Sequence, residues 1–334
     1  MRHAAVVALI AGTSLLSSAA PAVSPFIPPR FDVARSPATV VAGNDLLRAS
    51  DHDGDGRSEI TVYNTFSGVW SSLISSSGFT AATNRGWGGS GYAAAPGDYD
   101  GDGKTDLGLY DNMIGAWFVL LSSTNFTTSL MKNAGGPFWQ PLARDYDGDG
   151  KTDFVVYDIT SGQWYGLKST TLYTTTISVN WGGIGYDAVP ADYDGDGKAD
   201  LGVYSPGTGV WSVLLSSSNY TTSLSKSVGG AGWIPVPADY DGDGKADFVV
   251  YNVGSGQWYG LMSSTNYTTT LSVSWGGSLY QPVKGDFDGD GKADLALYVT
   301  STGWWYILLS STNYTTTIAR NWGGTGYAAT PRYP

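Results

Sequence analysis

The segment Asp98-Tyr99-Asp100-Gly101-Asp102-Gly103-Lys104-Thr105-Asp106 indicates how the rest of the 334-residue chain is organised. Five further segments share its pattern of acidic and glycine residues, and they begin at Asp51, Asp145, Asp192, Asp239 and Asp286. Each segment begins 47 residues after the previous one, without an insertion or deletion. Self-similarity at a period of this length is typical of solenoids, propellers and other arrays, so we interpret the chain as a repeat protein.

Three other series of residues keep the same period. They are a tryptophan series (Trp70, Trp117, Trp164, Trp211, Trp258, Trp305), a tyrosine series (Tyr63, Tyr110, Tyr157, Tyr204, Tyr251, Tyr298) and a glycine series (Gly68, Gly115, Gly162, Gly209, Gly256, Gly303). Within one repeat, aromatic and aliphatic residues form four short segments at 201–204, 210–215, 220–225 and 233–237, separated by Gly, Pro, Asn and Ser. Four strands in about 47 residues predict one blade of a β-propeller, whose ring also protects the sheet edges.

Six acidic loops predict an all-β propeller of six four-stranded blades. Residues 326–331 repeat the segment 91–96 that precedes the second loop, so a seventh, partial blade closed by the two termini remains an alternative. We divide the chain into a signal peptide at 1–22, an N-terminal segment at 23–44 that is a candidate ring-closing strand, and a six-repeat propeller at 45–334.

The first residues have the pattern of an export signal. Met1-Arg2-His3 is basic, residues 4–16 are apolar and uncharged, and small residues follow at 17–22. This order is typical of a secretory signal peptide, and the apolar run is shorter than the ~20 residues needed to span a bilayer. We therefore expect a secreted, extracellular protein, with or without cell-surface association, and no membrane span in the mature form.

The amino-acid composition excludes or disfavours several classes of function for this chain. The chain has 18 basic and 29 acidic residues and a net charge of −11, which argues against a nucleic-acid partner. It contains no cysteine, so disulfides and thiolate chemistry are excluded. Its two histidines are His3 and His52, and no Ser/His/Asp set can be assembled, so we expect that the protein is not an enzyme.

The loops have the composition of calcium sites. In each nine-residue loop, carboxylates occupy positions 1, 3, 5 and 9, glycine at position 6 permits a sharp turn, and the carbonyl of position 7 can face the same centre. These hard oxygen donors suit Ca²⁺, whereas Zn²⁺ prefers His or Cys and Mg²⁺ prefers few carboxylates with retained waters. A solvated acidic turn could explain one such loop but not six. Loss of Arg2 with the signal peptide would leave a net charge of −12, which about six Ca²⁺ ions would balance.

With their Trp-Gly-Gly and Val-Pro-x-Asp-Tyr-Asp-Gly-Asp-Gly segments, these loops resemble FG-GAP/VCBS-type repeats, including the calcium loops of integrin alpha propellers. The resemblance covers residues 45 to about 330 and implies that positions 1, 3, 5, 7 and 9 are metal ligands. The implied ligands are Asp51, Asp53, Asp55, Arg57, Glu59; Asp98, Asp100, Asp102, Lys104, Asp106; Asp145, Asp147, Asp149, Lys151, Asp153; Asp192, Asp194, Asp196, Lys198, Asp200; Asp239, Asp241, Asp243, Lys245, Asp247; and Asp286, Asp288, Asp290, Lys292, Asp294. The first loop departs from the pattern because it ends in Glu59.

Three functional hypotheses remain. The first is a non-enzymatic adhesion or ligand-binding scaffold for a surface or matrix protein or glycan, the use to which the resembling family is commonly put. The alternative is a lectin-type carbohydrate-binding protein, and a calcium-dependent hydrolase or lyase ranks last. Trp304 and the pair Phe138-Trp139 depart from the repeat pattern and could stack on a sugar, although we favour ordinary packing variation for both.

Overall fold

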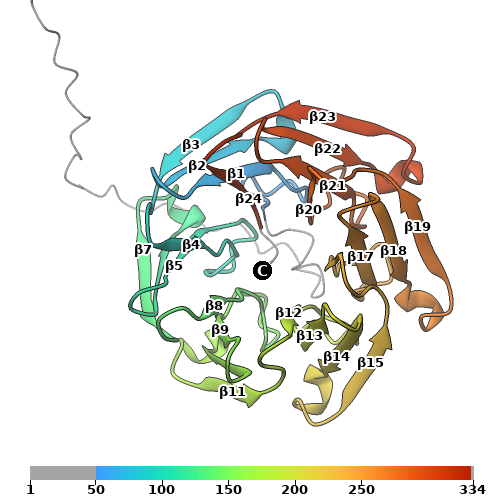
Figure 1. The fold of residues 1–334 in the computed structure, drawn as a ribbon. Helices are drawn as coiled ribbons and strands as arrows, with labels where there is room; N and C mark the ends of the chain where they lie inside the picture. Colours follow the sequence, from blue (N-terminus) through green and yellow to red (C-terminus); the bar gives the residue numbers. More distant parts are fainter. Residues whose placement is uncertain (1–49, 332–334) are drawn as a thin grey trace, which may run out of the picture. The chain divides into compact units, whose positions relative to one another are not determined.

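The computed structural model describes residues 50–331, which form an all-β propeller of six blades arranged in a ring (Figure 1). Each blade is a four-stranded antiparallel sheet, as the sequence predicts. Within this part of the chain, no helix is long and apolar enough to cross a membrane. The predicted signal peptide at 1–22 and the segment 23–44 lie outside the described residues.

The strands of each blade run in order from the ring axis outward. The first blade contains β24 (Tyr327–Thr330), β1 (Ile60–Asn64), β2 (Val69–Leu73) and β3 (Ala82–Gly86), and the second contains β4 (Tyr92–Ala94), β5 (Leu107–Asp111), β6 (Ala116–Leu120) and β7 (Ser129–Asn133). The third contains β8 (Gln140–Pro141), β9 (Phe154–Asp158), β10 (Gln163–Leu167) and β11 (Thr176–Asn180), and the fourth contains β12 (Asp187–Ala188), β13 (Leu201–Ser205), β14 (Val210–Leu214) and β15 (Ser223–Ser227). The fifth contains β16 (Trp233–Pro235), β17 (Phe248–Asn252), β18 (Gln257–Leu261) and β19 (Thr270–Ser274), and the sixth contains β20 (Gln281–Val283), β21 (Leu295–Val299), β22 (Trp304–Leu308) and β23 (Thr317–Asn321).

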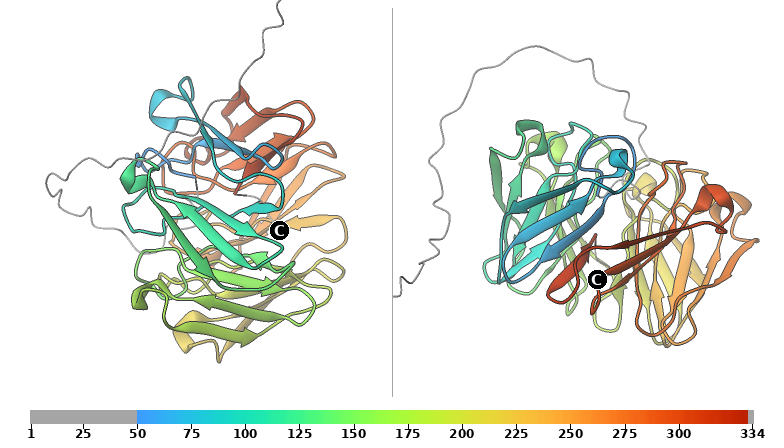
Figure 2. Two further views of the ribbon diagram at one scale, coloured as in Figure 1. Left: turned by 90° about the vertical axis from the view of Figure 1, so that its left-hand side faces the viewer. Right: turned by 90° about the horizontal axis from the view of Figure 1, so that it is seen from above.

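The sequence repeat is offset from the blade by one strand. Each repeat supplies the three outer strands of one blade and the innermost strand of the next, so the four segments of one repeat do not form one sheet. The last repeat therefore ends in a strand, β24, whose partner is β1 of the first blade, in the register Thr61↔Thr330 to Asn64↔Tyr327 (Figures 1 and 2). The alternative of a seventh blade is wrong, because the segment that suggested it closes the ring of six.

A short 3₁₀ helix links the third and fourth strands of every blade. These helices are η1 (Ser75–Ser77), η2 (Ser122–Thr124), η3 (Ser169–Thr171), η4 (Ser216–Ser218), η5 (Ser263–Thr265) and η6 (Ser310–Thr312). The following two residues have positive φ, for example 56° at Asn219 and 62° at Tyr220. The predicted segment 220–225 thus begins in a turn, and its strand starts only at Ser223.

Residues of the tyrosine, tryptophan and glycine series fix the same segment of the chain, the one that leaves the outermost strand of a blade. In the fourth blade, the Tyr204 hydroxyl accepts the N–H of Gly230 (2.7 Å), and the Trp211 indole N–H donates to the Val228 carbonyl (3.1 Å). Gly229 has φ +95°, and a Cβ there would lie 2.5 Å from the tyrosine oxygen. A Cβ at Gly209 would lie 2.8 Å from the Gly229 carbonyl, so this close approach requires glycine at both positions.

The hydrophobic core lies between neighbouring blades. Five of the six inter-blade clusters contain nine to eleven buried residues, whereas the cluster between the first and second blades contains four: Tyr63, Trp70, Leu107 and Leu109. The alternation of repeats seen in the sequence has its basis here. Phe154 and Phe248 pack against stacked tyrosines at two of the interfaces, and Leu201 and Leu295 occupy the same position at the next ones.

Loss of the Tyr204–Gly230 hydrogen bond or of the close contact at Gly229 should destabilise the protein. We expect Tyr204→Phe to lower the free energy of unfolding by about 1–3 kcal/mol, because the Gly230 N–H loses its buried acceptor. Gly229→Ala should cost more, since its Cβ meets the Tyr204 oxygen at a positive φ. Urea denaturation measures both, with Gly207→Ala as control because that glycine has open space and no positive φ. Equal urea midpoints for Gly229→Ala and Gly207→Ala would contradict the claim that Gly229 has no room for a side chain.

Candidate functional site: six acidic loops and a cleft between two blades

Five of the six acidic loops join the innermost strand of a blade to the second strand, and the first loop leads into β1, whose inner neighbour β24 comes from the other end of the described chain. In every loop the carboxylate at position 1 shapes the turn. In the second loop, Oδ1 of Asp98 accepts the N–H of Gly101 (2.6 Å), and Oδ2 accepts the N–H of Gly103 (2.8 Å). Both glycines have φ near +80°, which a side chain would disfavour. The same pair of bonds recurs at Asp51, Asp145, Asp192, Asp239 and Asp286.

The carboxylate at position 9 anchors the loop to the blade. Asp106 is fully buried; its Oδ2 accepts the N–H of Tyr99 (2.8 Å), and its Oδ1 accepts the N–H and hydroxyl of Ser122 (2.6 and 2.7 Å). The Ser122 hydroxyl also lies 3.0 Å from Asp102 at position 5, and Ser123 donates to Asp100 at position 3. The two serines of η2 therefore hold three of the four carboxylates.

These serines are not among the residues predicted for the site, although their recurrence is visible in the sequence. Serine recurs at the same place in every repeat, as Ser75, Ser122, Ser169, Ser216, Ser263 and Ser310. In each repeat its backbone N–H donates to the carboxylate at position 9, which is Glu59 in the first loop and Asp in the others.

The carboxylates converge on a common point. One oxygen from each of Asp51, Asp53, Asp55 and Glu59 lies within 4.8 Å of the others, and so do carboxylate oxygens in the sets Asp98, Asp100, Asp106; Asp145, Asp147, Asp153; Asp192, Asp194, Asp200; and Asp239, Asp241, Asp243. Oδ1 of Asp100 and Oδ1 of Asp241 are buried and have no hydrogen-bond partner among the described residues. Buried, convergent oxygens with unused lone pairs fit a hard metal cation.

The residues at position 7, Arg57, Lys104, Lys151, Lys198, Lys245 and Lys292, are held by their backbone. In every loop the N–H of this residue donates to the carboxylate at position 5, at 2.9–3.0 Å. Their side chains extend away from their own loop and lie over the glycine at position 4 of the preceding loop. The side-chain charges thus lie outside the oxygen cluster, and only the carbonyl of position 7 is left as the predicted ligand.

Burial makes these carboxylates costly to ionise in the metal-free protein. It raises the pKa of Asp98 and of Asp106 to about 7, although their hydrogen bonds from backbone N–H groups oppose the shift and the neighbouring carboxylates add to it. In the first loop, burial raises the pKa of Glu59 to about 8. A bound cation would stabilise the ionised form, so the energetics of the loops are coupled to metal binding.

Hydrogen bonds join the loops into a closed ring. The N–H of position 8 donates to the carbonyl of position 1 in the preceding loop, at 2.6–2.7 Å, in all six cases. The series includes Thr105 to Asp51 and closes with Ser58 to Asp286, which links the first loop to the last. Ions bound in the loops would therefore lie at the contacts between blades.

One inter-blade interface is incompletely filled. Between the first and second blades lies a cleft of about 480 Å³, lined by residues that include His52, Trp70, Arg85, Asn125 and Phe126. The Arg85 guanidinium lies 4.4 Å from the centroid of the Phe126 ring and donates to the Asn125 side chain (3.2 Å). The cleft thus presents an apolar ring beside polar and cationic groups.

The cleft lies at the interface where His52 stands in place of a larger ring. Position 2 of the other loops holds Tyr99, Tyr146, Tyr193, Tyr240 or Phe287, and these rings are buried in the neighbouring inter-blade clusters. The smaller His52 ring has its Nδ1 3.1 Å from the Thr105 carbonyl, so Nδ1 carries the proton. Nε2 is then an acceptor, and it is buried without a partner among the described residues. Burial lowers the pKa of His52 to about 4, so the ring is neutral at pH 7.

The irregular aromatic residues divide into two groups. Trp139 packs against the cluster between the second and third blades, as expected for packing variation. Phe138, however, is 77% exposed, and Trp304 is 41% exposed and stacks on Tyr306 at 5.9 Å. The expectation of ordinary packing therefore does not hold for Phe138 and Trp304.

Comparisons with known proteins agree with this architecture. Residues 145–203 and 239–297 match the FG-GAP-like repeat family. No curated protein matches the chain at the sequence level. Among solved structures, a lectin from Agrocybe aegerita that recognises non-reducing terminal N-acetylglucosamine has a TM-score of 0.56 and 17% identity, and the match covers 80% of this chain and 78% of the lectin.

Two further solved structures are similar at lower scores. An auxiliary nutrient binding protein from Bacteroides ovatus has a TM-score of 0.41 and 12% identity, with 77% of this chain and 74% of that chain covered. The dihydro-heme d1 dehydrogenase NirN has a TM-score of 0.36 and 12% identity, with 80% of this chain and 54% of that chain covered.

The buried carboxylates predict an unusual pH dependence. Because the folded pKa values lie near 6–8 and the unfolded values near 4, each such group stabilises the metal-free fold most fully below pH ~4, and this stabilisation is lost as the pH rises through 6–8. Thermal unfolding of protein freed of metal with EDTA should therefore show Tm falling from pH 5 to pH 8. With excess Ca²⁺, the gain in Tm should grow over the same range. A metal-free Tm that rises with pH would contradict this assignment.

Proposed function

We propose that this chain, an FG-GAP-type six-bladed propeller, is a secreted, calcium-stabilised, non-enzymatic protein that binds a glycan in the cleft between its first two blades. The observation that carries the proposal is the cleft itself, which exists where His52 replaces the larger ring of the other loops. Export suits the calcium loops, because extracellular modules of this kind bind Ca²⁺ with Kd of roughly 10⁻⁴–10⁻³ M.

Calcium is the cation that the loops suit best. Three or four carboxylates and one carbonyl per loop would supply most of the six to eight oxygen ligands of Ca²⁺, whereas Mg²⁺ demands a smaller octahedral site with several waters. The proposed ligands are the side chains at positions 1, 3, 5 and 9 and the carbonyl at position 7. A bound ion would supply the positive charge that the buried carboxylates need.

The cleft has the properties of a monosaccharide site. Its volume of about 480 Å³ lies within the range of small-molecule pockets. The half-buried Phe126 contributes an apolar side chain to the lining, while Arg85 and Asn125 offer hydrogen-bond donors and an acceptor for sugar hydroxyls. The similar lectin from Agrocybe aegerita supports a glycan ligand for a propeller of this fold.

A protein partner is the second candidate, and a different surface favours it. The turns between the second and third strands of the first three blades expose Phe66 (84%), Met113, Ile114 and Ile159. Because the strands of each blade are antiparallel, these turns lie on the face opposite the acidic loops. Apolar side chains exposed on adjacent blades are typical of protein contact surfaces.

The calcium proposal is tested by thermal unfolding of EDTA-treated protein with added Ca²⁺ or Mg²⁺. At 100 times Kd, each occupied site should add about 2.7 kcal/mol to the free energy of unfolding, so Ca²⁺ should raise Tm strongly and Mg²⁺ much less. Asp200→Asn should remove roughly one sixth of the Ca²⁺-dependent gain in the free energy of unfolding, because it disrupts one of the six sites.

Asp111→Asn is the matched control, because asparagine occupies the equivalent turn position in the first and fifth blades, as Asn64 and Asn252. The proposal fails if neither ion raises Tm, or if the two variants respond alike to Ca²⁺.

The cleft proposal is tested on a glycan array in calcium, followed by titration of the best ligand. His52→Tyr inserts the ring found in four other loops, so it should fill the cleft and weaken binding at least 10-fold without loss of thermal stability. Arg85→Ala should also weaken binding, whereas Lys132→Ala, at the equivalent position of the second blade, should not. Undiminished binding by His52→Tyr would place the glycan elsewhere, and the absence of any bound glycan would favour the protein partner.

A further inference from the structure

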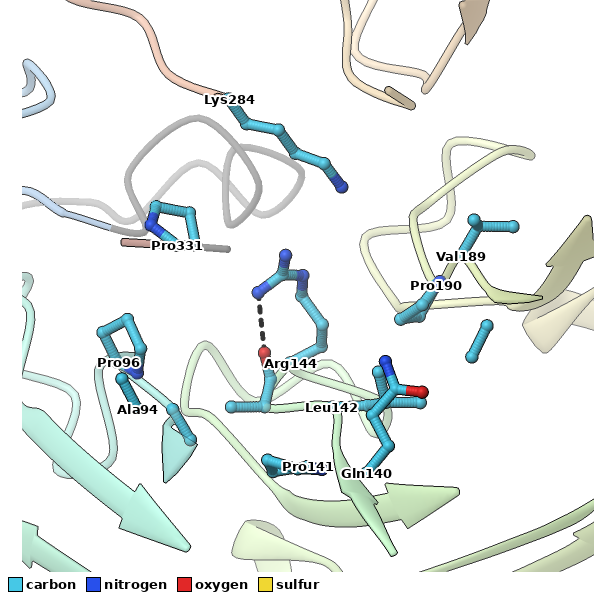
Figure 3. Close-up of a pocket in the computed structure, with 13 residues that line it drawn as sticks. Ala94, Pro96, Gln140, Pro141, Leu142, Arg144, Val189, Pro190, Lys284 and Pro331 are labelled. Carbon is cyan, nitrogen blue, oxygen red and sulfur yellow. Dashed lines mark hydrogen bonds between the residues drawn. The ribbon is translucent and has the colours of Figure 1, made fainter. Parts of the chain in front are cut away.

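Charged side chains are distributed unevenly between the two faces of the ring. On one face, each acidic loop carries four carboxylates and one Lys or Arg. The residues that lead into these loops line an axial cavity of about 170 Å³, and they include Arg144 and Lys284 (Figure 3). The opposite face is formed by the turns between the second and third strands of each blade and by the connections from each outermost strand to the next blade.

None of the twelve connections on this opposite face contains Asp, Glu, Lys, Arg or His. Charges next to it, such as Asp111, Asp158 and Lys132, belong to the flanking strands. We call these connections the uncharged face; they are the turns 65–68, 112–115, 159–162, 206–209, 253–256 and 300–303 and the outer connections 87–91, 134–139, 181–186, 228–232, 275–280 and 322–326.

The uncharged face also carries most of the exposed apolar side chains. Within residues 50–331, eleven large apolar side chains are exposed, and all but Met131 and Leu172 lie on these connections or at the strand end beside them. Ile184, for example, is 83% exposed. Apolar side chains that gather on one face, rather than being scattered over the surface, mark an interaction site.

Hydrogen bonds hold these connections in place. In every blade the N–H of the first residue of the outer connection donates to the carbonyl of the last residue of the turn, at 2.7–3.2 Å, as from Trp87 to Gly68. Connections of successive blades are joined as well, because the Phe138 N–H donates to the Asn112 carbonyl (2.9 Å) and the Asn112 N–H to the Gly91 carbonyl (3.2 Å). The face is therefore preorganised, which lowers the entropic cost of covering it.

Phe138 keeps its exposed ring against a backbone cost. Its φ is +66°, and four of the other five repeats have glycine at this position, whereas the fifth repeat has Leu279. A bulky side chain at positive φ is unfavourable, and a ring that is 77% exposed gains little packing to offset the cost. Strain of this kind persists at binding sites more often than in ordinary surface loops.

The absence of charge restricts the kind of partner. A partner recognised by opposite charge would find nothing to pair with on these connections. A lipid bilayer is disfavoured because most of the remaining residues are Gly, Ser and Thr, whose exposed backbone and hydroxyl groups would lack hydrogen-bond partners in hydrocarbon. In a two-fold dimer, by contrast, a patch meets its own copy, so a face without charge is complementary to itself. Depletion of charge and enrichment in aromatic residues and Met are also typical of interface cores.

We propose that the uncharged face is a self-association surface, on which two copies of this chain form a face-to-face dimer with two-fold symmetry. This inference rests on the second candidate of the proposed function, a protein partner, and names that partner. The chain has a net charge of −11 before any metal binds, and pairing through the uncharged face keeps the acidic loops of both copies on the outside.

The dimer would leave both glycan clefts free. The cleft is lined by His52 and Asp53 of the first acidic loop and by Ser122 and Ser123 of η2, which lie at the opposite face. Two copies joined through their uncharged faces would therefore present two clefts on opposite sides of the dimer. Such a dimer could bridge two glycan-bearing surfaces and gain avidity without any new contact.

Sedimentation velocity of the full chain in Ca²⁺-containing buffer tests the proposal, over protein concentrations from about 1 µM to about 100 µM, which cover weak and standard-size interfaces. We expect a reversible increase to twice the monomer mass. Raising NaCl from about 0.1 M to about 0.5 M should leave the dimer Kd within about 2-fold, because the interface contains no charges for salt to screen.

A triple variant removes exposed apolar side chains by using residues that other repeats have at the same positions. Phe66→Ser, Phe138→Gly and Ile184→Ser introduce the residues found at Ser301, Gly91 and Ser90, and Phe138→Gly also suits the positive φ. The triple variant should weaken the dimer at least 10-fold without lowering Tm. Leu172→Asn is the matched control, because Leu172 is 81% exposed beside η3 on the acidic-loop face and four other repeats have asparagine there.

The proposal is overturned if the protein is a monomer at every concentration, if the triple variant dimerises like the wild-type protein, or if species larger than a dimer form. Monomeric protein that floats with phosphatidylcholine vesicles would also overturn it, in favour of a membrane surface. His52→Tyr should dimerise like the wild-type protein, and the triple variant should keep its affinity for a monovalent glycan. Failure of the dimer is thus distinguishable from failure of the glycan cleft.

Discussion

The hydrogen bond from position 8 of one loop to the carbonyl of position 1 in the preceding loop is the constraint on which the ring depends. It occurs six times at 2.6–2.7 Å and closes from Ser58 to Asp286, so every blade is tied to its predecessor at the same point. The bond requires each loop to hold a fixed backbone shape. That shape is set by two N–H groups donating to the first carboxylate and by the buried carboxylate at position 9. The acidic residues are therefore part of the inter-blade contact as well as candidate metal ligands.

This arrangement gives the loops two opposing energetic roles. Their hydrogen bonds define the turn, yet burial of several carboxylates so close together disfavours the ionised state that metal binding needs. A bound cation would resolve the conflict, because it would stabilise the charges and leave the backbone hydrogen bonds in place. Metal binding and the association of neighbouring blades would then be coupled, and loss of an ion from any loop would weaken a contact between two blades.

The period, the all-β class and the count of six blades could be predicted from the sequence, because the hydrophobic and turn patterns repeat without an insertion. The strands at which one blade ends and the next begins could not be predicted. Nothing in the residues 201–237 shows that the segment at 233–235 pairs with the next blade, since strand pairing depends on contacts between distant segments. The cluster of loop carboxylates could be predicted from spacing alone, but the role of Ser122 required knowledge that η2 folds back over the loop. The axial cavity could not be predicted, because it needs the radial order of the strands.

A ring of near-identical blades limits where a single binding site can arise. A site built from repeated residues would occur up to six times, so a unique site must use positions at which one repeat differs from the others. His52 and Lys284 are such positions, and each lines a cavity rather than a packed cluster. The repeated residues explain the scaffold, whereas these two exceptions replace a larger ring at one interface and place a basic residue in a largely apolar lining. Averaging the repeats into a consensus would erase both, so in this fold the departures from the period are the better guide to ligand chemistry.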